Sequence, residues 1–393
     1  MASIEQERWL RFAWNAARYA LGPIGGLLVP WLVIQRSSQE AWGQVVLPMI
    51  LVQLVAHITQ WGSKDLLLRE FARMPDRVLD LWRASAITRA VPWIVCALML
   101  TRSGLILKDA WAMSWLVGLV LANNVEPLII WGKKFAGAAV ADAMGLGVQV
   151  AIILWNQYLD ADTICLSFAG NQIARALILW SVVGFPSLGH AFRLFNMRMH
   201  LLTALPFFLI GFSGLLASRI DLYTANVLLD RAEVGRYQIV ASLFIQFQAL
   251  AALVVTPLTK DLYRLNIESV SRYGRRMRMW ALAGLLPMCA IAWAVFTFLF
   301  KFELSWGVYA AAGALVWPVF AYVPMMNQLY KHHRELSVMW ANFAAAALTC
   351  GLTLVLLPKL GIAGGLLAAA AGQWLMLAWM KREEHRLHAL PRM

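Results

Sequence analysis

Polar and charged side chains recur at helical spacing inside the first long apolar stretch of this chain. Arg11, Asn15, Arg18, Gly22 and Gly25 are three or four residues apart, so a helix presents them on one face. A charge inside hydrocarbon is costly unless it meets water or a partner. Arg18 is therefore a candidate for binding phosphate through two parallel hydrogen bonds, with Asn15 beside it. The alternative is a guanidinium that extends to the lipid headgroups.

A second polar row follows, in which Gln53, His57, Gln60 and Lys64 again share one helix face. Lipid contact does not explain a whole polar row, so we expect it to face the interior of a helix bundle. His57 is a candidate for ion coupling, because histidine titrates near neutral pH; the alternative is a histidine that only bridges helices. Lys64 is a candidate for substrate binding or for headgroup contact.

Arg175 stands near the middle of the sixth apolar stretch, in line with Ser167 and Asn171 at four-residue steps. An arginine at mid-membrane has little access to headgroups, so we expect Arg175 and Asn171 to line a cavity. Glu126 and Asp142 are the carboxylates of the fourth and fifth stretches. Each either neutralises a cavity arginine or forms a structural salt bridge, and both are candidates for ion coupling.

The seventh stretch carries Arg219 and Asp221, which point to nearly opposite sides of a helix at this spacing. Each must therefore find a group on another helix or in water. We expect Arg219 to bind substrate and Asp221 to be an ion or proton site, against the alternative of a structural partner for a nearby cation. The last four stretches contain almost no interior charge, so the interior charges are concentrated in the earlier stretches. Because several of these charges are arginines, the sequence predicts a cationic cavity for an anionic ligand.

Membrane-spanning helices are the elements that must position these residues. Each of twelve apolar stretches approaches the ~20 residues that a helix needs to cross hydrocarbon. The composition agrees, with 61% hydrophobic and 14% charged residues, where about 25% charged is usual for a soluble domain. The predicted spans are Trp9–Ile34, Trp42–Leu68, Leu79–Leu100, Trp111–Trp131, Phe135–Tyr158, Ile164–Phe185, Leu201–Leu228, Val234–Leu258, Met279–Phe300, Leu304–Leu329, Leu336–Leu357 and Ile362–Trp379.

The net charge of +13 is distributed unevenly between alternate loops. Lys and Arg gather at both termini and after even-numbered stretches, and few follow odd-numbered stretches. This bias predicts that both termini are cytoplasmic. It also explains the net positive charge by the orientation of the helices in the membrane and by contact with anionic lipids, rather than by binding of nucleic acid. Glu5 and Glu7, without a cleavage site after the first apolar run, predict that this run remains as a span.

The sequence contains no recognisable motif for an enzyme, a metal or a cofactor. Its four cysteines, Cys96, Cys165, Cys289 and Cys350, all lie in apolar runs, and none forms a C-x-x-C pair. There is no Walker A sequence, so ATP is not expected to drive the protein. We therefore predict a membrane protein that is not an enzyme, without metal or cofactor.

The twelve stretches divide into two similar halves. Gly43 and Gly235 each stand near the start of a long helix that ends in Lys-Asp, at Lys64-Asp65 and Lys260-Asp261. Because six spans separate the copies, both halves run in the same direction. We predict an all-α polytopic fold with two six-helix lobes, related by a pseudo-two-fold axis along the membrane normal. The predicted regions are an N-terminal lobe 1–186, a cytoplasmic linker 187–200 and a C-terminal lobe 201–393.

Several of these segments resemble one transporter family. The chain is similar to O-antigen (Wzx-type) polysaccharide flippases of the multidrug/oligosaccharidyl-lipid/polysaccharide exporter superfamily. The resemblance rests on the R-x-D of Arg219–Asp221, the E-x-G-x-Y-like turn 233–237, Glu40–Gly43 with Leu68-Arg69-Glu70, and the glycines of 361–365. Compared with the family, the chain is short and its odd-side loops are nearly absent.

The resemblance implies a bacterial inner-membrane flippase for an undecaprenyl-diphosphate-linked oligosaccharide. The implied motion is alternating access, driven by Na⁺, H⁺ or the membrane potential. The implied partners are the lipid-linked glycan, membrane lipids and a glycan polymerase or glycosyltransferases of the same pathway, and we expect a monomer. The alternatives are a cation-coupled drug or metabolite antiporter of the same fold, and a polytopic glycosyltransferase or ligase. The short loops argue against the last of these.

Overall fold

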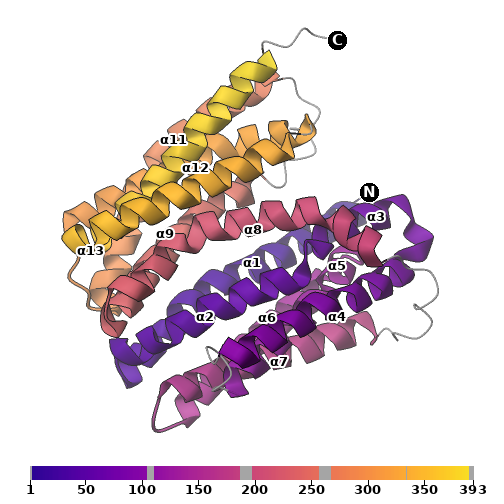
Figure 1. Ribbon diagram of the computed structural model, residues 1–393, viewed down its shortest axis with the longest axis horizontal. Coiled ribbons are helices and arrows are strands. Elements are labelled where there is room, and N and C mark those ends of the chain that lie inside the picture. Colours follow the sequence, from indigo (N-terminus) through magenta and orange to yellow (C-terminus); the bar gives the residue numbers. More distant parts are fainter. Residues whose placement is uncertain (1, 104–109, 186–196, 256–266, 333, 389–393) are drawn as a thin grey trace. The chain divides into compact units, whose positions relative to one another are not determined.

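The computed structural model describes residues 2–103, 110–185, 197–255, 267–332 and 334–388, and these residues form helices joined by short turns (Figure 1). The all-helical prediction is confirmed. The main helices are α1 (Ala2–Arg36), α2 (Gln39–Gln60), α3 (Ser63–Arg73), α4 (Val78–Ser103), α5 (Ala110–Trp131), α6 (Phe135–Trp155), α7 (Ala161–Val183), α8 (Met197–Leu228), α9 (Arg231–Val255), α11 (Ile267–Ala294), α12 (Trp306–Lys331) and α13 (Glu335–His388).

Nine helical stretches among the described residues are long and apolar enough to cross a membrane. α13 counts once among the nine although it contains two helices, separated at Gly361, whose φ is 56°. A Cβ on Gly372 would lie 2.3 Å from Thr349 Oγ1 and 3.1 Å from Ala345 O, so the two parts of α13 pack against each other in opposite directions. α2 and α3 together count as one of the nine stretches. Adding α4, α9 and the second part of α13 gives the twelve helices that the sequence predicts.

The predicted second span, Trp42–Leu68, is wrong as a continuous helix. The helix ends at Gln60, and the next two residues, Trp61 and Gly62, both have positive φ, 47° and 64°. A Cβ on Gly62 would lie 2.4 Å from the backbone nitrogen of Phe208, so this position requires glycine for both conformation and space. The turn separates Lys64, on α3, from His57, on α2, and the polar row does not continue across it.

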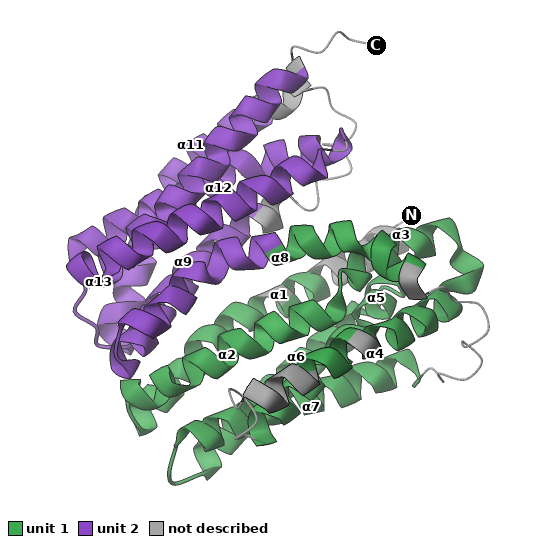
Figure 2. Ribbon diagram, in the orientation of Figure 1, with its two compact units in different colours: residues 1–212 green, residues 213–393 purple. Residues whose placement is uncertain are grey.

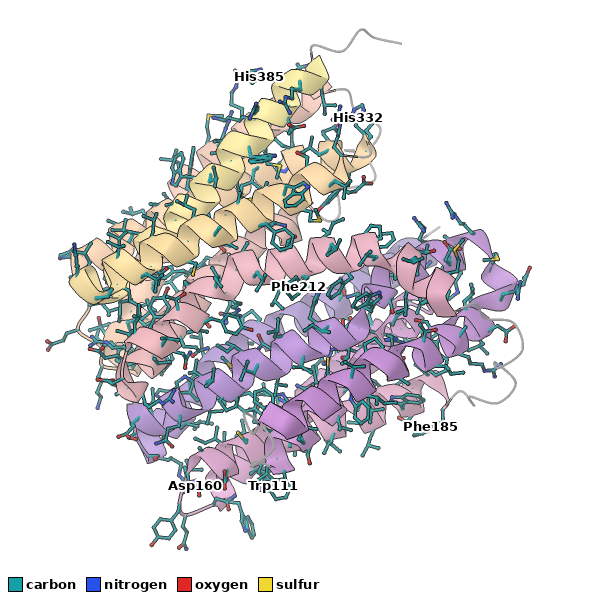
Figure 3. All side chains as sticks on the ribbon, viewed as in Figure 1. Trp111, Asp160, Phe185, Phe212, His332 and His385 are labelled. Atoms are coloured by element: carbon teal, nitrogen blue, oxygen red, sulfur yellow. The ribbon has the colours of Figure 1, made fainter. Side chains whose placement is uncertain are left out.

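Unit 1, residues 1–212, contains α1 to α7 and the first part of α8 (Figure 2). Its best-packed part is the group α5, α6 and α7. Glycines allow this packing: a Cβ on Gly118 would lie 2.9 Å from the backbone of Gln172, and one on Gly137 would lie 2.7 Å from Val182. At the start of α7, Asp160 Oδ1 accepts a hydrogen bond from the Thr163 amide (2.8 Å), which lowers the pKa of Asp160 (Figure 3).

Unit 2, residues 213–393, contains the rest of α8 with α9, α11, α12 and α13 (Figure 2). Its core joins α12 to both parts of α13 through buried apolar residues, including Met325, Leu329, Ala345 and Met380. Tyr322 adds a hydrogen bond to Gln373 Oε1 at 2.7 Å. The predicted linker 187–200 lies mostly in 186–196, and Lys260-Asp261 lies in 256–266, both outside the described residues. The predicted lobe limits and the repeat therefore stay predictions.

Candidate functional site

Five charged side chains from five helices meet inside unit 1. Arg18 of α1 donates a hydrogen bond from Nε to Asp142 Oδ2 on α6 (3.0 Å) and from Nη2 to Glu126 Oε2 on α5 (2.9 Å). Arg175 of α7 reaches the same carboxylates, with Nε at 2.5 Å from Asp142 Oδ1 and Nη2 at 3.7 Å from Glu126 Oε2. Lys64 of α3 lies with Nζ at 3.5 Å from Glu126 Oε1. We call Arg18, Lys64, Glu126, Asp142 and Arg175 the charge cluster.

The charge cluster is positive and largely shielded from solvent. Three cations share two carboxylates, which leaves a formal charge of +1. The side chains of Arg18, Glu126, Asp142 and Arg175 are only 11–16% exposed, whereas that of Lys64 is 43% exposed. Partners of opposite charge at these distances remove much of the cost of placing ions within a helix bundle. Guanidinium groups bind phosphate as well as carboxylate through paired hydrogen bonds.

A glycine sets the distance between the two helices that carry Asp142 and Arg175. A Cβ on Gly145 of α6 would lie 2.5 Å from Asn171 Oδ1 and 3.3 Å from Arg175 Cβ. Asn171 donates to Gln149 Oε1 at 2.6 Å, one turn along α7 from Arg175. The row Asp142, Gly145 and Gln149 on α6 thus faces Asn171 and Arg175 on α7.

The structure brings together most of the candidates predicted in the first half of the chain. Arg18, Lys64, Arg175, Glu126 and Asp142 form the cluster, and each carboxylate contacts arginine, one of the two roles expected for it. Asn171 lies beside the cluster and bonds Gln149. Asn15 is half-buried on α1, one turn before Arg18. Spacing along single helices identified Asn15, Arg18, Lys64, Asn171 and Arg175, whereas Glu126 and Asp142 were selected as carboxylates within predicted spans.

His57 lies apart from the charge cluster. Its ring stacks between α2 and α8 on the rings of Phe208 and Phe212, with centroids 6.0 and 6.5 Å away (Figure 3). A Cβ on Gly211 would lie 2.7 Å from His57 Cε1, so α8 approaches the imidazole closely. This placement fits the helix-bridging alternative, and the coupling role of His57 stays a prediction without support from its neighbours.

Arg219 and Asp221 form a second polar group, within unit 2. Asp221 is only 5% exposed and accepts a hydrogen bond from the hydroxyl of Tyr237 on α9 (2.5 Å). A Cβ on Gly365 of α13 would lie 2.6 Å from Tyr237 Cε2, so this glycine makes room for the phenol ring. Among the described residues, the guanidinium of Arg219 donates no hydrogen bond.

Two polar groups escaped selection from the sequence. Tyr237 stood within the turn that carries the family resemblance, but a tyrosine in an apolar helix gives no signal that it meets a carboxylate. Arg89 of α4 is 8% exposed and donates hydrogen bonds to Asn124 Oδ1 and to Ser85 O. The signal for Arg89 was its position inside a predicted span. No group of three potential metal-binding side chains occurs in the described part of the chain.

Comparison with known proteins places the fold. No protein-family model matches the chain, and no curated protein matches it. Among solved structures, the lipid II flippase MurJ in an inward closed conformation is similar over 97% of this chain and 88% of its own, at 11% identity and a TM-score of 0.73. An inward-facing MATE-family multidrug resistance transporter of the MOP superfamily is similar over 96% of this chain and 100% of its own, at 14% identity and a TM-score of 0.69.

A MATE transporter in complex with MaL6 gives a TM-score of 0.63 at 12% identity, over 97% of this chain and 96% of its own. At such identities the likeness is one of fold. The chain therefore has the two-lobe, twelve-helix fold of these membrane transporters, and the predicted fold class is confirmed.

Proposed function

We propose that this chain is a flippase that moves an anionic lipid-linked oligosaccharide, of the undecaprenyl-diphosphate type, from the cytoplasmic to the periplasmic leaflet. The observation that carries the proposal is the charge cluster, which holds two arginines and a lysine within membrane-spanning helices and keeps a formal charge of +1. The flippase fold among the similar structures supports it.

The proposed binding step is an exchange of anions. Arg18 and Arg175 each contact both Glu126 and Asp142. A diphosphate that enters the cluster replaces carboxylate oxygens as the acceptor of guanidinium hydrogen bonds, with the bidentate geometry that arginine favours. The sugars stay in the aqueous cavity and the hydrocarbon tail stays in the bilayer. Rocking of the two lobes then exposes the site to the other side.

Substitution of the two cluster arginines tests the proposal. We expect Arg18→Ala and Arg175→Ala each to lower flipping of a labelled lipid-linked oligosaccharide in proteoliposomes at least tenfold. The lysine variants should recover part of the rate, since they keep the charge and lose the paired hydrogen bonds. Arg73→Ala is the matched control, because Arg73 is 65% exposed and its partner Glu70 keeps a second cation, Arg69, when Arg73 is removed.

The protein content of the vesicles must be equal in every comparison. Flipping at the control rate by both alanine variants would contradict the proposal and leave the arginines as structural groups. Arg219→Ala, in the same assay, tests the predicted substrate contact in unit 2.

A cation-coupled drug or metabolite antiporter remains the second candidate. Two observations favour it: Glu126 and Asp142 are carboxylates only 14% and 16% exposed within the membrane-spanning part, and MATE transporters have this fold. Efflux of an organic cation from vesicles distinguishes the two. An antiporter needs the carboxylates and should lose efflux in Glu126→Gln or Asp142→Asn, whereas a flippase should move no organic cation in any variant.

A further inference from the structure

An apolar groove on unit 2 is lined by residues of α9, α11 and α12. It has a volume of about 310 Å³, and its lining residues include Phe247, Met277, Trp280, Gly284, Met288 and Phe320. Among the residues that the structure describes, no charged side chain lines the groove. Trp280 is 68% exposed, so the groove opens on the surface of the unit. Both α11 and α12 contain candidate spans, which places the groove at the depth of hydrocarbon.

A cluster of arginines stands at the end of the same groove. Arg272, Arg275, Arg276 and Arg278 occupy the first two turns of the candidate span Arg272–Leu299. By helical spacing, Arg276 lies one turn before Trp280, and Arg276 and Arg278 flank the row that lines the groove. Among the side chains that the structure describes, none of the four arginines forms an ion pair.

We propose that this groove and its arginines are a binding site for an anionic phospholipid of the surrounding membrane, with one acyl chain in the groove. The apolar lining fits a hydrocarbon chain, and a cluster of four arginines where the span begins fits a phosphate headgroup. The arginine charge complements an anionic headgroup, whereas a second protein would have to bring its own acidic side chains into the interface. The charge cluster lies in unit 1 and this site lies in unit 2, and we assign to this site a lipid that the protein does not transport.

The site can be tested by native mass spectrometry of the purified protein, titrated with phosphatidylglycerol or phosphatidylcholine. We expect one phosphatidylglycerol to bind in preference to phosphatidylcholine. A basic residue near a charged lipid surface contributes about fivefold in affinity. Arg276→Gln with Arg278→Gln should therefore weaken phosphatidylglycerol binding about 30-fold and leave phosphatidylcholine binding unchanged. Lys381→Gln with Arg382→Gln removes two exposed cations on α13 as the matched control.

A second variant tests the groove itself. Gly284 lines the groove, and a Cβ on Gly284 meets no atom within 4 Å, so Gly284→Leu adds a side chain at an unobstructed position of the lining. It should weaken binding of both lipids, while Gly351→Leu, at another unobstructed glycine, should weaken neither.

Three results would overturn the proposal. The first is unchanged phosphatidylglycerol affinity in the double arginine variant, and the second is unchanged lipid binding in Gly284→Leu. The third is displacement of phosphatidylglycerol by equimolar undecaprenyl phosphate, which would assign the groove to the tail of a transported lipid. None of these results bears on the proposed role of the charge cluster, which has its own assay.

Discussion

Glu126 holds the charge cluster together. It lies 2.9 Å from Arg18, 3.5 Å from Lys64 and 3.7 Å from Arg175. Removal of one partner from a buried ion pair typically costs about 3–5 kcal/mol, because the remaining charges lose their counterion. Because that cost is large, replacing Glu126 tests whether the charge cluster also stabilises the folded protein.

We expect Glu126→Gln to lower the free energy of unfolding by about 3 kcal/mol. Asp80→Asn is the control, since Asp80 is 62% exposed and pairs with Arg83 one turn away, an arrangement worth about 0.5 kcal/mol. Thermal unfolding of both variants in detergent, followed by tryptophan fluorescence, provides the comparison. Equal midpoints for the two variants would contradict a stabilising role of Glu126.

We propose Asp221 as the carboxylate in unit 2 through which an ion gradient acts. Its buried hydrogen bond with the Tyr237 hydroxyl changes strength when the carboxylate gains or loses a proton. We expect Asp221→Asn to slow flipping and to flatten its dependence on an imposed ion gradient. Tyr237→Phe keeps the ring against Gly365 and should weaken that dependence in part, while Tyr158→Phe, at an 86% exposed residue, should not.

His57→Ala should have a smaller effect on gradient dependence than Asp221→Asn, because the imidazole packs on phenylalanine rings rather than on a charged group. The measurement is flipping in proteoliposomes at several gradients. Full gradient dependence in Asp221→Asn would remove Asp221 from coupling and leave it as a structural partner of Tyr237.

The sequence was informative about single residues and much less so about pairs. Arg18 and Arg175 were selected because an arginine within an apolar helix needs a partner. That both use Asp142 was not predictable, since Arg18 and Asp142 are 124 positions apart and nothing local sets the distance between α1 and α6. The Tyr237–Asp221 hydrogen bond joins residues only 16 positions apart, and it was missed because a tyrosine in an apolar helix gives no sign of a carboxylate partner.

At the scale of elements, helix contact depends on small residues at few positions. Gly145 and Gly147 lie two residues apart on α6, and only Gly145 faces α7: its Cβ would lie 2.5 Å from Asn171 Oδ1, whereas a Cβ on Gly147 meets nothing within 4 Å. Alanine favours a helix over glycine by about 1 kcal/mol, so the two positions should respond with opposite sign.

We expect Gly145→Ala to destabilise the protein by about 1–3 kcal/mol, because it forces α6 and α7 apart. Gly147→Ala should be neutral or stabilising. Thermal unfolding gives the stability, and flipping assays show whether the charge cluster tolerates the shift. Equal stability of the two variants would mean that α7 moves away without cost.

Helix positions were largely predictable and helix ends were not. Apolar length located each span, because hydrocarbon thickness fixes the number of residues needed. The break after Gln60 was missed because Trp61 adopts positive φ, which sequence rarely indicates for a bulky residue. Gly361, by contrast, lies at the break that was predicted between the last two helices.

For the whole molecule, the unequal charge of alternate loops predicts the topology. Reporter fusions after Arg77, Arg193 and Arg276 should all report a cytoplasmic location, because basic loops stay on the cytoplasmic side. The residue Arg193 lies outside the described residues, so the fusion tests what the structure leaves open there. A periplasmic signal at any of the three sites would contradict the twelve-helix topology.

The charge cluster also bears on how the protein responds to voltage. One elementary charge that crosses the whole membrane field gains or loses about 2.3 kcal/mol per 100 mV. Three cations without counterions would couple three charges to that field, but Glu126 and Asp142 travel with them and leave one. If the empty lobe moves through part of the field, the two carboxylates reduce its electrical work about threefold. In the proposed cycle, the two carboxylates would therefore limit how strongly the membrane potential opposes or favours the return of the empty protein.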